Sequence, residues 1–153
     1  MDRRKELFVF LLSAVLCFSV FTGCEAGEPE LQVILNGNYY EIDGRASSIC
    51  RTNWLGEQFI QEVSWENSLG CYILETKEDD TEIILAFSVL PDSLQIEITD
   101  SEGRSEVKNI SASETCTLTV STDCSYLITG TWNIGNTRYE MEYARITVRT
   151  GKY

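Results

Sequence analysis

The cysteines are the residues of this sequence whose type and spacing could do chemistry, because the chain has six of them and no histidine. Without an imidazole, Ser-His-Asp and Cys-His catalysis, histidine-ligated zinc and histidine-based pH switching are excluded. No two cysteines have the Cys-x-x-Cys spacing, so a thiolate-ligated zinc site is not expected either. We therefore predict no metal and no cofactor. The remaining acid–base groups are carboxylates, tyrosines, lysines and thiols.

Four cysteines follow residue 31, an even number that suits a disulfide-bonded domain in an oxidising compartment: Cys50, Cys71, Cys116 and Cys124. Three connectivities are open. Proximity along the chain favours Cys50 with Cys71 and Cys116 with Cys124. Because Cys116 and Cys124 also fall in phase with apolar strand faces, free buried thiols are the alternative.

Carboxylates are the other abundant reactive groups, and they are densest at Glu78, Asp79, Asp80 and Glu82. This cluster lacks the alternate ligand spacing and the central glycine of an EF-hand loop, so we interpret it as a solvated turn. A carboxylate pair could in principle hydrolyse a glycoside, but such chemistry normally needs a larger scaffold around a cleft. No catalytic residue is predicted, and a small carboxylate-based hydrolase is the least favoured function.

The N-terminus carries a signal for export. Residues 3–5 are cationic, and residues 7–21 form an apolar run of about 15 residues. A helix needs about 20 residues to cross a hydrocarbon core, so this run is typical of a secretory signal peptide. The following Phe21-Thr22-Gly23-Cys24 resembles the lipobox of bacterial lipoprotein precursors. The resemblance implies cleavage before Cys24 and a diacylglycerol on its sulfur, which would hold the chain on a membrane. An ordinary cleaved signal peptide is the alternative.

Three segments follow from this interpretation: a signal peptide at 1–23, the lipidated Cys24 with a short tether to residue 30, and one domain at 31–153. Beyond residue 24, nine Lys and Arg face 22 Asp and Glu, a net charge of −13. So acidic a surface repels phosphates, and nucleic acid is not an expected partner. The tether of residues 25–30 spans at most about 20 Å. We therefore expect the domain close to the extracytoplasmic face of the bacterial cell membrane.

From residue 31 onward, apolar and polar residues alternate with the period of a β-strand. Asn36-Gly37 is a strong hairpin signal, and a second turn is predicted at Asp43-Gly44. In the last strand the apolar phase switches at Tyr143–Ala144, which predicts a β-bulge or an exchange of the buried face. Residues 45–70 have mixed spacing and are predicted as short strands with a long loop. The clearer strands are predicted at 31–35, 39–42, 70–76, 82–89, 94–99, 107–110, 116–120, 126–134 and 138–149.

Eight or so strands, frequent turns and no long helix are typical of an antiparallel β-sandwich. The spacing Tyr126-x-Ile128-x-Gly130-x-Trp132-x-x-Gly135-x-x-x-Tyr139 resembles the last two strands of Ig-like domains in small Gram-positive lipoproteins of uncharacterised function. Pro91-Asp92-Ser93-Leu94 is similar to the middle of those domains. The resemblance covers residues 82–148 and the lipobox. It implies an all-β, antiparallel Ig-like β-sandwich at the cell surface, and it carries over no catalytic residue.

Exposed aromatic side chains are the favoured candidates for recognition. Tyr39, Tyr40 and Trp54 lie in a region rich in turns, and loops on a rigid sandwich commonly make binding contacts. The alternative is packing in the core, where tryptophan usually serves as an anchor. The resulting hypothesis is a membrane-anchored extracytoplasmic binding or interaction module without catalysis, with a protein or glycan ligand. The alternative function is an accessory lipoprotein of a membrane transporter or sensor complex.

Overall fold

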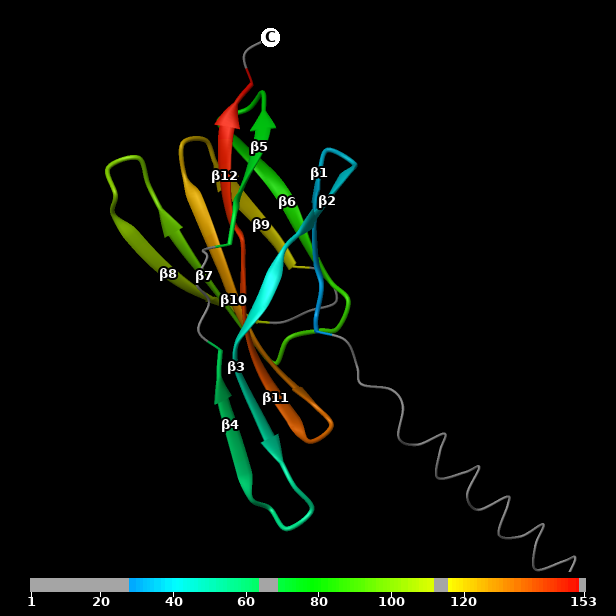
Figure 1. The fold of residues 1–153 in the computed structure, drawn as a ribbon. Coiled ribbons are helices and arrows are strands. Elements are labelled where there is room, and N and C mark those ends of the chain that lie inside the picture. The colour runs from blue at the N-terminus through cyan, green and yellow to red at the C-terminus, as the bar shows by residue number, and fades with distance from the viewer. Residues whose placement is uncertain (1–27, 64–68, 112–115, 152–153) are drawn as a thin grey trace, which may run out of the picture.

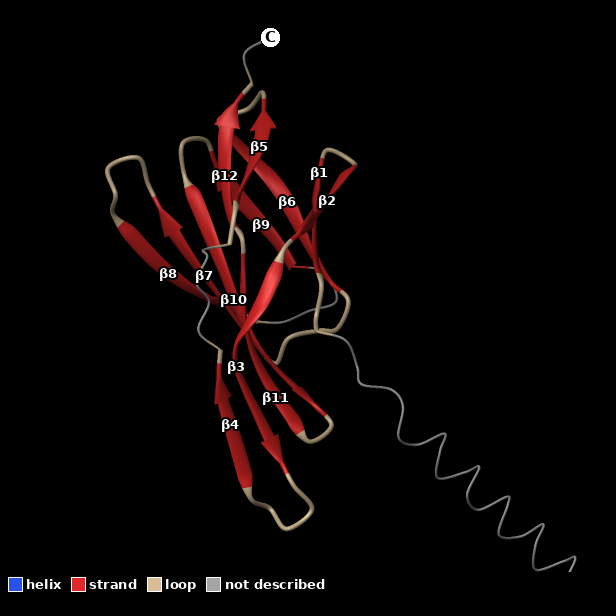
Figure 2. Ribbon diagram, viewed as in Figure 1, coloured by secondary structure: helices blue, strands red, loops and turns tan. Residues whose placement is uncertain are grey.

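Two β-sheets, packed face to face in a sandwich-like arrangement, form the protein in a computed structural model that describes residues 28–63, 69–111 and 116–151 (Figures 1 and 2). The predicted signal peptide, the lipobox with Cys24 and the second tryptophan, Trp65, lie outside the described residues. No helix in the described ranges has the length and apolar character needed to span a bilayer. The all-β prediction is confirmed.

The first sheet has four antiparallel strands in the order β2-β1-β6-β9. Asn36 and Gly37 connect β1 to β2 with φ angles of 51° and 79°, and two positive φ angles are what a two-residue type I′ hairpin requires. The predicted hairpin is therefore confirmed. Alternate residues of β1 are buried, as its sequence pattern predicts. The bounds of the strands are β1 Leu31–Leu35, β2 Asn38–Ile42, β6 Asp80–Phe87 and β9 Cys116–Ser121.

The second sheet is built around β10, which pairs with β7 on one edge and with β11 and then β12 on the other. Strand β7 continues to β8, whereas β11 continues to β3 and β4, and β12 continues to β5. The sheet therefore forks, as Figure 1 shows. Its strands are β3 Gly44–Thr52, β4 Gln58–Glu62, β5 Cys71–Thr76, β7 Ser93–Thr99, β8 Ser105–Ile110, β10 Ser125–Ile134, β11 Thr137–Tyr143 and β12 Arg145–Thr150.

The fork results from the predicted β-bulge. Between the pairs Thr129↔Glu142 and Tyr126↔Ile146, β10 advances three residues and the returning strand advances four. One extra residue at Tyr143–Ala144 therefore bends the strand and divides it into β11 and β12. Both residues are buried, so each apolar phase of the sequence faces the core on its own side of the bulge.

The predicted turn at Asp43-Gly44 is wrong, because the chain passes from β2 directly into β3 and so changes sheet. At the crossing, Gly44 lies against the ring of Tyr143, and a Cβ atom at Gly44 would overlap the ring atoms Cδ1 and Cε1. Glycine allows this close approach of strand and ring. The Ala144 amide donates to the Asp43 carbonyl at 2.7 Å, which ties the bulge to the crossing.

Two further predictions about the sheets are corrected. The described residues form twelve strands, because residues 45–70, predicted as short strands with a long loop, contribute β3 and β4 and the bulge divides the last strand. The sandwich is also not purely antiparallel, since β5 pairs with β12 in parallel register.

The core lies between the two sheets and is centred on Trp132. This side chain is 0% exposed, and its ring centroid is 5.8 Å from that of Phe87 and 6.1 Å from that of Tyr143. Its indole Nε1 donates to the Val89 carbonyl at 2.8 Å, so the ring's only polar atom is paired. The predicted buried face of β10 is thereby confirmed at Tyr126, Ile128, Gly130 and Trp132.

All four cysteines among the described residues are free, so the structure contradicts both favoured disulfides. Cys50 pairs with Arg138 on β11, and Cys71 pairs with Arg145 on β12. Arg138 and Arg145 are seven residues apart along the bent strand, a distance of roughly 23 Å, so the two cysteines are separated by a similar distance. Cys116 begins β9, whereas Cys124 follows the end of that strand, roughly 17 Å farther along. A disulfide needs Cα atoms within about 7 Å.

Candidate functional site

One end of the second sheet projects beyond the first sheet, and we call this part the distal arm. It comprises residues 48–62, which contain the end of β3 and all of β4, and residues 133–140, where β10 turns into β11. Figure 1 shows the distal arm extending past the level at which β1 begins, with none of the four strands of the first sheet facing it. Strand β4 and the turn residues Trp54 and Leu55 are exposed, whereas Ile49, Ile134 and Tyr139 of the distal arm are partly buried against the core.

The distal arm exposes four large apolar side chains. Trp54 is 88% exposed, Ile60 66%, Leu55 61% and Phe59 60%. Phe59 and Ile60 are consecutive residues of β4, so their side chains lie on opposite faces of the sheet. Single exposed apolar residues are common on protein surfaces, but four large ones between residues 54 and 60 make this segment a candidate for an interaction site. The interpretation of Trp54 as a core anchor is therefore wrong.

Asn53 holds the turn at the tip of the distal arm in a defined conformation. Its Oδ1 atom accepts hydrogen bonds from the amides of Leu55 and Glu57, both at 2.9 Å. Its Nδ2 atom donates to the Glu57 carboxylate at 2.7 Å, and Gly56 adopts a positive φ of 82°. Such side-chain bonds to the backbone two and four residues ahead are the usual means by which asparagine stabilises a turn. Trp54 and Leu55 are thus displayed by an ordered turn.

Replacing Asn53 by alanine is expected to loosen this turn. Three hydrogen bonds at an exposed position are lost, and we expect a decrease in the free energy of unfolding of about 1–2 kcal/mol. Amide hydrogen exchange at Leu55 and Glu57 should accelerate by more than the decrease in global stability alone would cause. Asn109→Ala, which removes one exposed bond from Gln95 at 2.9 Å, is the control. Unchanged exchange at Leu55 and Glu57 would contradict the role given to Asn53.

The predicted binding aromatics do not form one surface. Tyr39 is 68% exposed on β2, an edge strand of the first sheet, whereas Tyr40 is partly buried and packs against the core. The β1–β2 turn next to Tyr39 and the β3–β4 turn that carries Trp54 lie at opposite ends of the molecule (Figure 1). Among the three candidates, Trp54 is the residue whose segment exposes further large apolar side chains, those of Leu55, Phe59 and Ile60.

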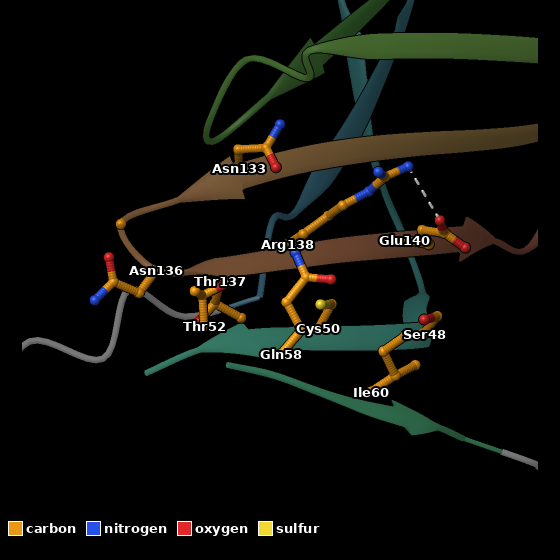
Figure 3. Close-up of a pocket in the computed structure, with 11 residues that line it drawn as sticks. Ser48, Cys50, Thr52, Gln58, Ile60, Asn133, Asn136, Thr137, Arg138 and Glu140 are labelled. Atoms are coloured by element: carbon orange, nitrogen blue, oxygen red, sulfur yellow. Dashed lines mark hydrogen bonds and ion pairs between the residues drawn. The ribbon is translucent and has the colours of Figure 1, made fainter. Parts of the chain in front are cut away.

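One face of the distal arm is hollowed into an open groove of about 480 Å³ (Figure 3). Its walls come from β3, β4 and the β10–β11 hairpin, and most of its side chains can form hydrogen bonds. Among these residues the sequence singled out Cys50 alone, and only as a possible disulfide partner, although polar residues at alternate positions of β3 are a signal of an open strand face. The side chains drawn in Figure 3 include Ser48, Cys50, Thr52, Gln58, Ile60, Asn133, Arg138 and Glu140.

The charges in the groove form one exposed ion pair. The Arg138 Nη2 atom lies 3.3 Å from the Glu140 Oε1 atom, and both side chains are about half exposed. An ion pair in such an environment contributes little to stability, so both groups can exchange this contact for a ligand. By contrast, the groups whose pKa is raised by burial, Cys116, Tyr126 and Tyr143, belong to the core. The groove thus has the features of a binding surface.

Carboxylates and thiols do not assemble into a metal site in the parts of the chain that the structure describes. Residues 78–80 of the acidic cluster are exposed, and they lie where the chain enters β6. The interpretation of this cluster as a solvated turn is consistent with that exposure.

The outer edge of the distal arm is β4, the terminal strand on this branch of the sheet. All five of its residues, Gln58–Glu62, are exposed. Strand β8 ends another branch of the sheet and is protected by charges, because Lys108 lies 3.6 Å from Glu106 and flanks Val107. Lysine or proline normally protects an edge strand from pairing, and β4 contains neither.

Comparisons of this chain with protein-family models, with curated proteins and with solved structures find no match.

Proposed function

We propose that the protein is a membrane-anchored extracytoplasmic binding module that holds an extended segment of a protein partner along β4. The observation that carries this proposal is the edge strand itself, which is exposed over its whole length and lacks protecting charges at its centre. The proposal includes no catalysis. The recognition element is the distal arm, and the sandwich positions it.

Addition of a strand to β4 accounts for the features of the distal arm. An extended peptide beside β4 would pair with its backbone, and its alternate side chains would enter the groove next to Gln58 and Ile60. Arg138 supplies hydrogen-bond donors deeper in the groove, whereas the Asn133 side-chain amide donates to the Asp92 carboxylate at 3.0 Å. Backbone pairing supplies affinity in this mode, and the side-chain contacts supply specificity.

Anchoring and fold type complete the proposal. The lipobox-like Phe21-Thr22-Gly23-Cys24 supports lipidation at Cys24 and retention on the outer face of the membrane. Two packed sheets with Trp132 buried on a central strand support a variant of the Ig-like sandwich.

The experiment is capture of partners from the native envelope with the full mature protein and with two matched variants. Ile60→Lys places a charge on the unprotected edge and should reduce the captured partner at least tenfold. Val107→Lys makes the same change at a residue that is 59% exposed on the protected edge strand β8, and it should capture as much partner as the parent. Equal capture by both variants would contradict binding at β4. A transporter or sensor subunit among the captured proteins would identify the module as an accessory of that complex.

A further inference from the structure

We infer that Trp54 and Leu55, at the tip of the distal arm, enter the surface of the lipid bilayer on which the protein is anchored. The inference rests on the proposed lipidation of Cys24 and adds a second membrane contact to it. It follows from where the chain enters the domain, from how far the distal arm extends and from the chemistry of its tip.

The entry of the chain into the domain is fixed beside the start of the distal arm's strand. The Tyr143 hydroxyl donates to the Pro29 carbonyl at 2.8 Å, and the ring of the same tyrosine lies against Gly44, the first residue of β3. Glu30 exchanges two hydrogen bonds with Ser88, at 2.8 and 3.0 Å. Pro29 and Gly44 are therefore at the same level of the molecule. Figure 1 shows the distal arm projecting from this level, away from the β1–β2 turn.

The distal arm reaches farther from this level than the lipid anchor can. Eight residue steps along β3, from Gly44 to Thr52, span roughly 26 Å, and the tip lies beyond Thr52. Five residue steps from Cys24 to Pro29 span at most about 18 Å. If the domain is oriented with the distal arm toward the membrane, the tip of the arm therefore lies at least as close to the bilayer as Cys24 does.

The opposite orientation is excluded by the same limit. The β1–β2 turn lies seven residue steps from Pro29, roughly 23 Å in extended chain, and the sandwich fills that length. A tether of about 18 Å cannot pass the turn and reach a membrane beyond it. The protein can stand on its distal arm or lean to one side with the distal arm along the surface.

The tip has the composition of a membrane-surface contact. Tryptophan concentrates at the boundary between headgroups and acyl chains, and leucine adds apolar area below it. Within residues 50–60 the charges are Arg51 and Glu57, which sum to zero, although the chain as a whole carries −12. The tip is thus free of the repulsion that the rest of the protein meets at anionic headgroups. Its contact should be driven by apolar burial and should change little with salt.

The experiment uses the full mature lipidated protein in phosphatidylcholine vesicles with bromine on the acyl chains. Trp65→Phe is present throughout, which leaves Trp54 and Trp132 as the fluorescent residues. We expect bromolipid to quench the emission by a third or more at both low and high salt. Trp54→Phe should abolish this quenching, because Trp132 is sealed in the core. Tyr39→Trp, added to Trp54→Phe, places the probe at the opposite end, where quenching should not return.

Flotation of the same vesicles separates the two proposals. Lipidated protein should float with the vesicles, and the same mature chain from residue 24 prepared without the lipid should not. Flotation without quenching of Trp54 would overturn the bilayer contact and leave the anchored module intact. Failure of the lipidated protein to float would overturn the anchoring and this inference with it. Shielding of Trp54 from iodide that grows with protein concentration in the absence of vesicles would assign the tip to a second copy and also overturn the inference.

Discussion

Replacing Trp132 by alanine is expected to lower the free energy of unfolding by about 3–5 kcal/mol, as truncation of a large buried aromatic usually does. The ring is fully buried and packs edge-on against Phe87 and Tyr143, and its nitrogen is paired with the Val89 carbonyl. The alanine variant would leave that carbonyl without its partner and would open a cavity between the sheets. The backbone of Gly130 lies under the ring, where a Cβ atom would come within 2.5 Å of Trp132. Because glycine has no side chain, Gly130 cannot fill the cavity that the alanine variant would leave.

The matched control is Trp54→Ala, which makes the same change at a residue that is 88% exposed. An exposed truncation away from caps and networks should change stability by no more than about 0.5 kcal/mol. Denaturant unfolding of both variants, compared at equal m-value, checks the prediction. A loss at position 54 as large as that at position 132 would show that Trp54 is packed in solution and would remove the basis of the proposed membrane contact.

The protein is expected to lose stability steeply as the pH rises above 10, because burial holds tyrosine hydroxyls protonated in the fold. Burial raises the pKa of Tyr143 and of Tyr126 above the ordinary value of 10.0. Above pH 10 the unfolded chain releases these protons while the folded chain retains them. The stabilisation is therefore complete below pH 10 and is lost as the pH rises toward the folded pKa. Tyr143 contributes a slope that approaches about 1.4 kcal/mol per pH unit in this window, and Tyr126 contributes in the same direction.

The test is chemical denaturation between pH 8 and 11 of the parent, Tyr143→Phe and Tyr39→Phe. At neutral pH the loss of the Tyr143–Pro29 hydrogen bond should cost about 1 kcal/mol or somewhat more, since the carbonyl stays buried. Above pH 10 the slope of the Tyr143→Phe variant should be shallower by about 1.4 kcal/mol per pH unit. Tyr39→Phe, at an exposed tyrosine, should keep the parent slope. Identical slopes for all three proteins would exclude Tyr143 as a source of the alkaline transition.

The strands that alternate cleanly in sequence were predictable, because one face of each meets the core and the other meets solvent. This holds for β7 and β9, and for β10, where the run from Tyr126 to Trp132 is buried at every second position. The phase switch at Tyr143–Ala144 predicted the bulge for the same reason. A half-buried strand records its orientation in its own side chains.

The distal arm could not be predicted in this way. Strand β4 has no buried face, so apolar and polar residues do not alternate in its sequence. Residues 45–70 were therefore predicted as short strands around a loop, and Trp54 was open to interpretation as a core anchor. The polar alternation of β3 indicates an open strand face, but the groove itself could not be predicted, because its side chains come together through pairings among β3, β4 and β11.

By itself the sequence determined the all-β character, the period-two strands around Trp132, the first hairpin and the position of the bulge, since these depend on contacts between a residue and its near neighbours or on whether its side chain meets water. Only the tertiary structure decided the crossing from β2 to β3, the parallel pairing of β5 with β12, the separation of the cysteines and the distal arm. Those features depend on which distant strands become neighbours, and backbone pairing is almost independent of side-chain identity. The residues that the fold leaves without a buried partner are the ones now proposed to meet the membrane and a second protein.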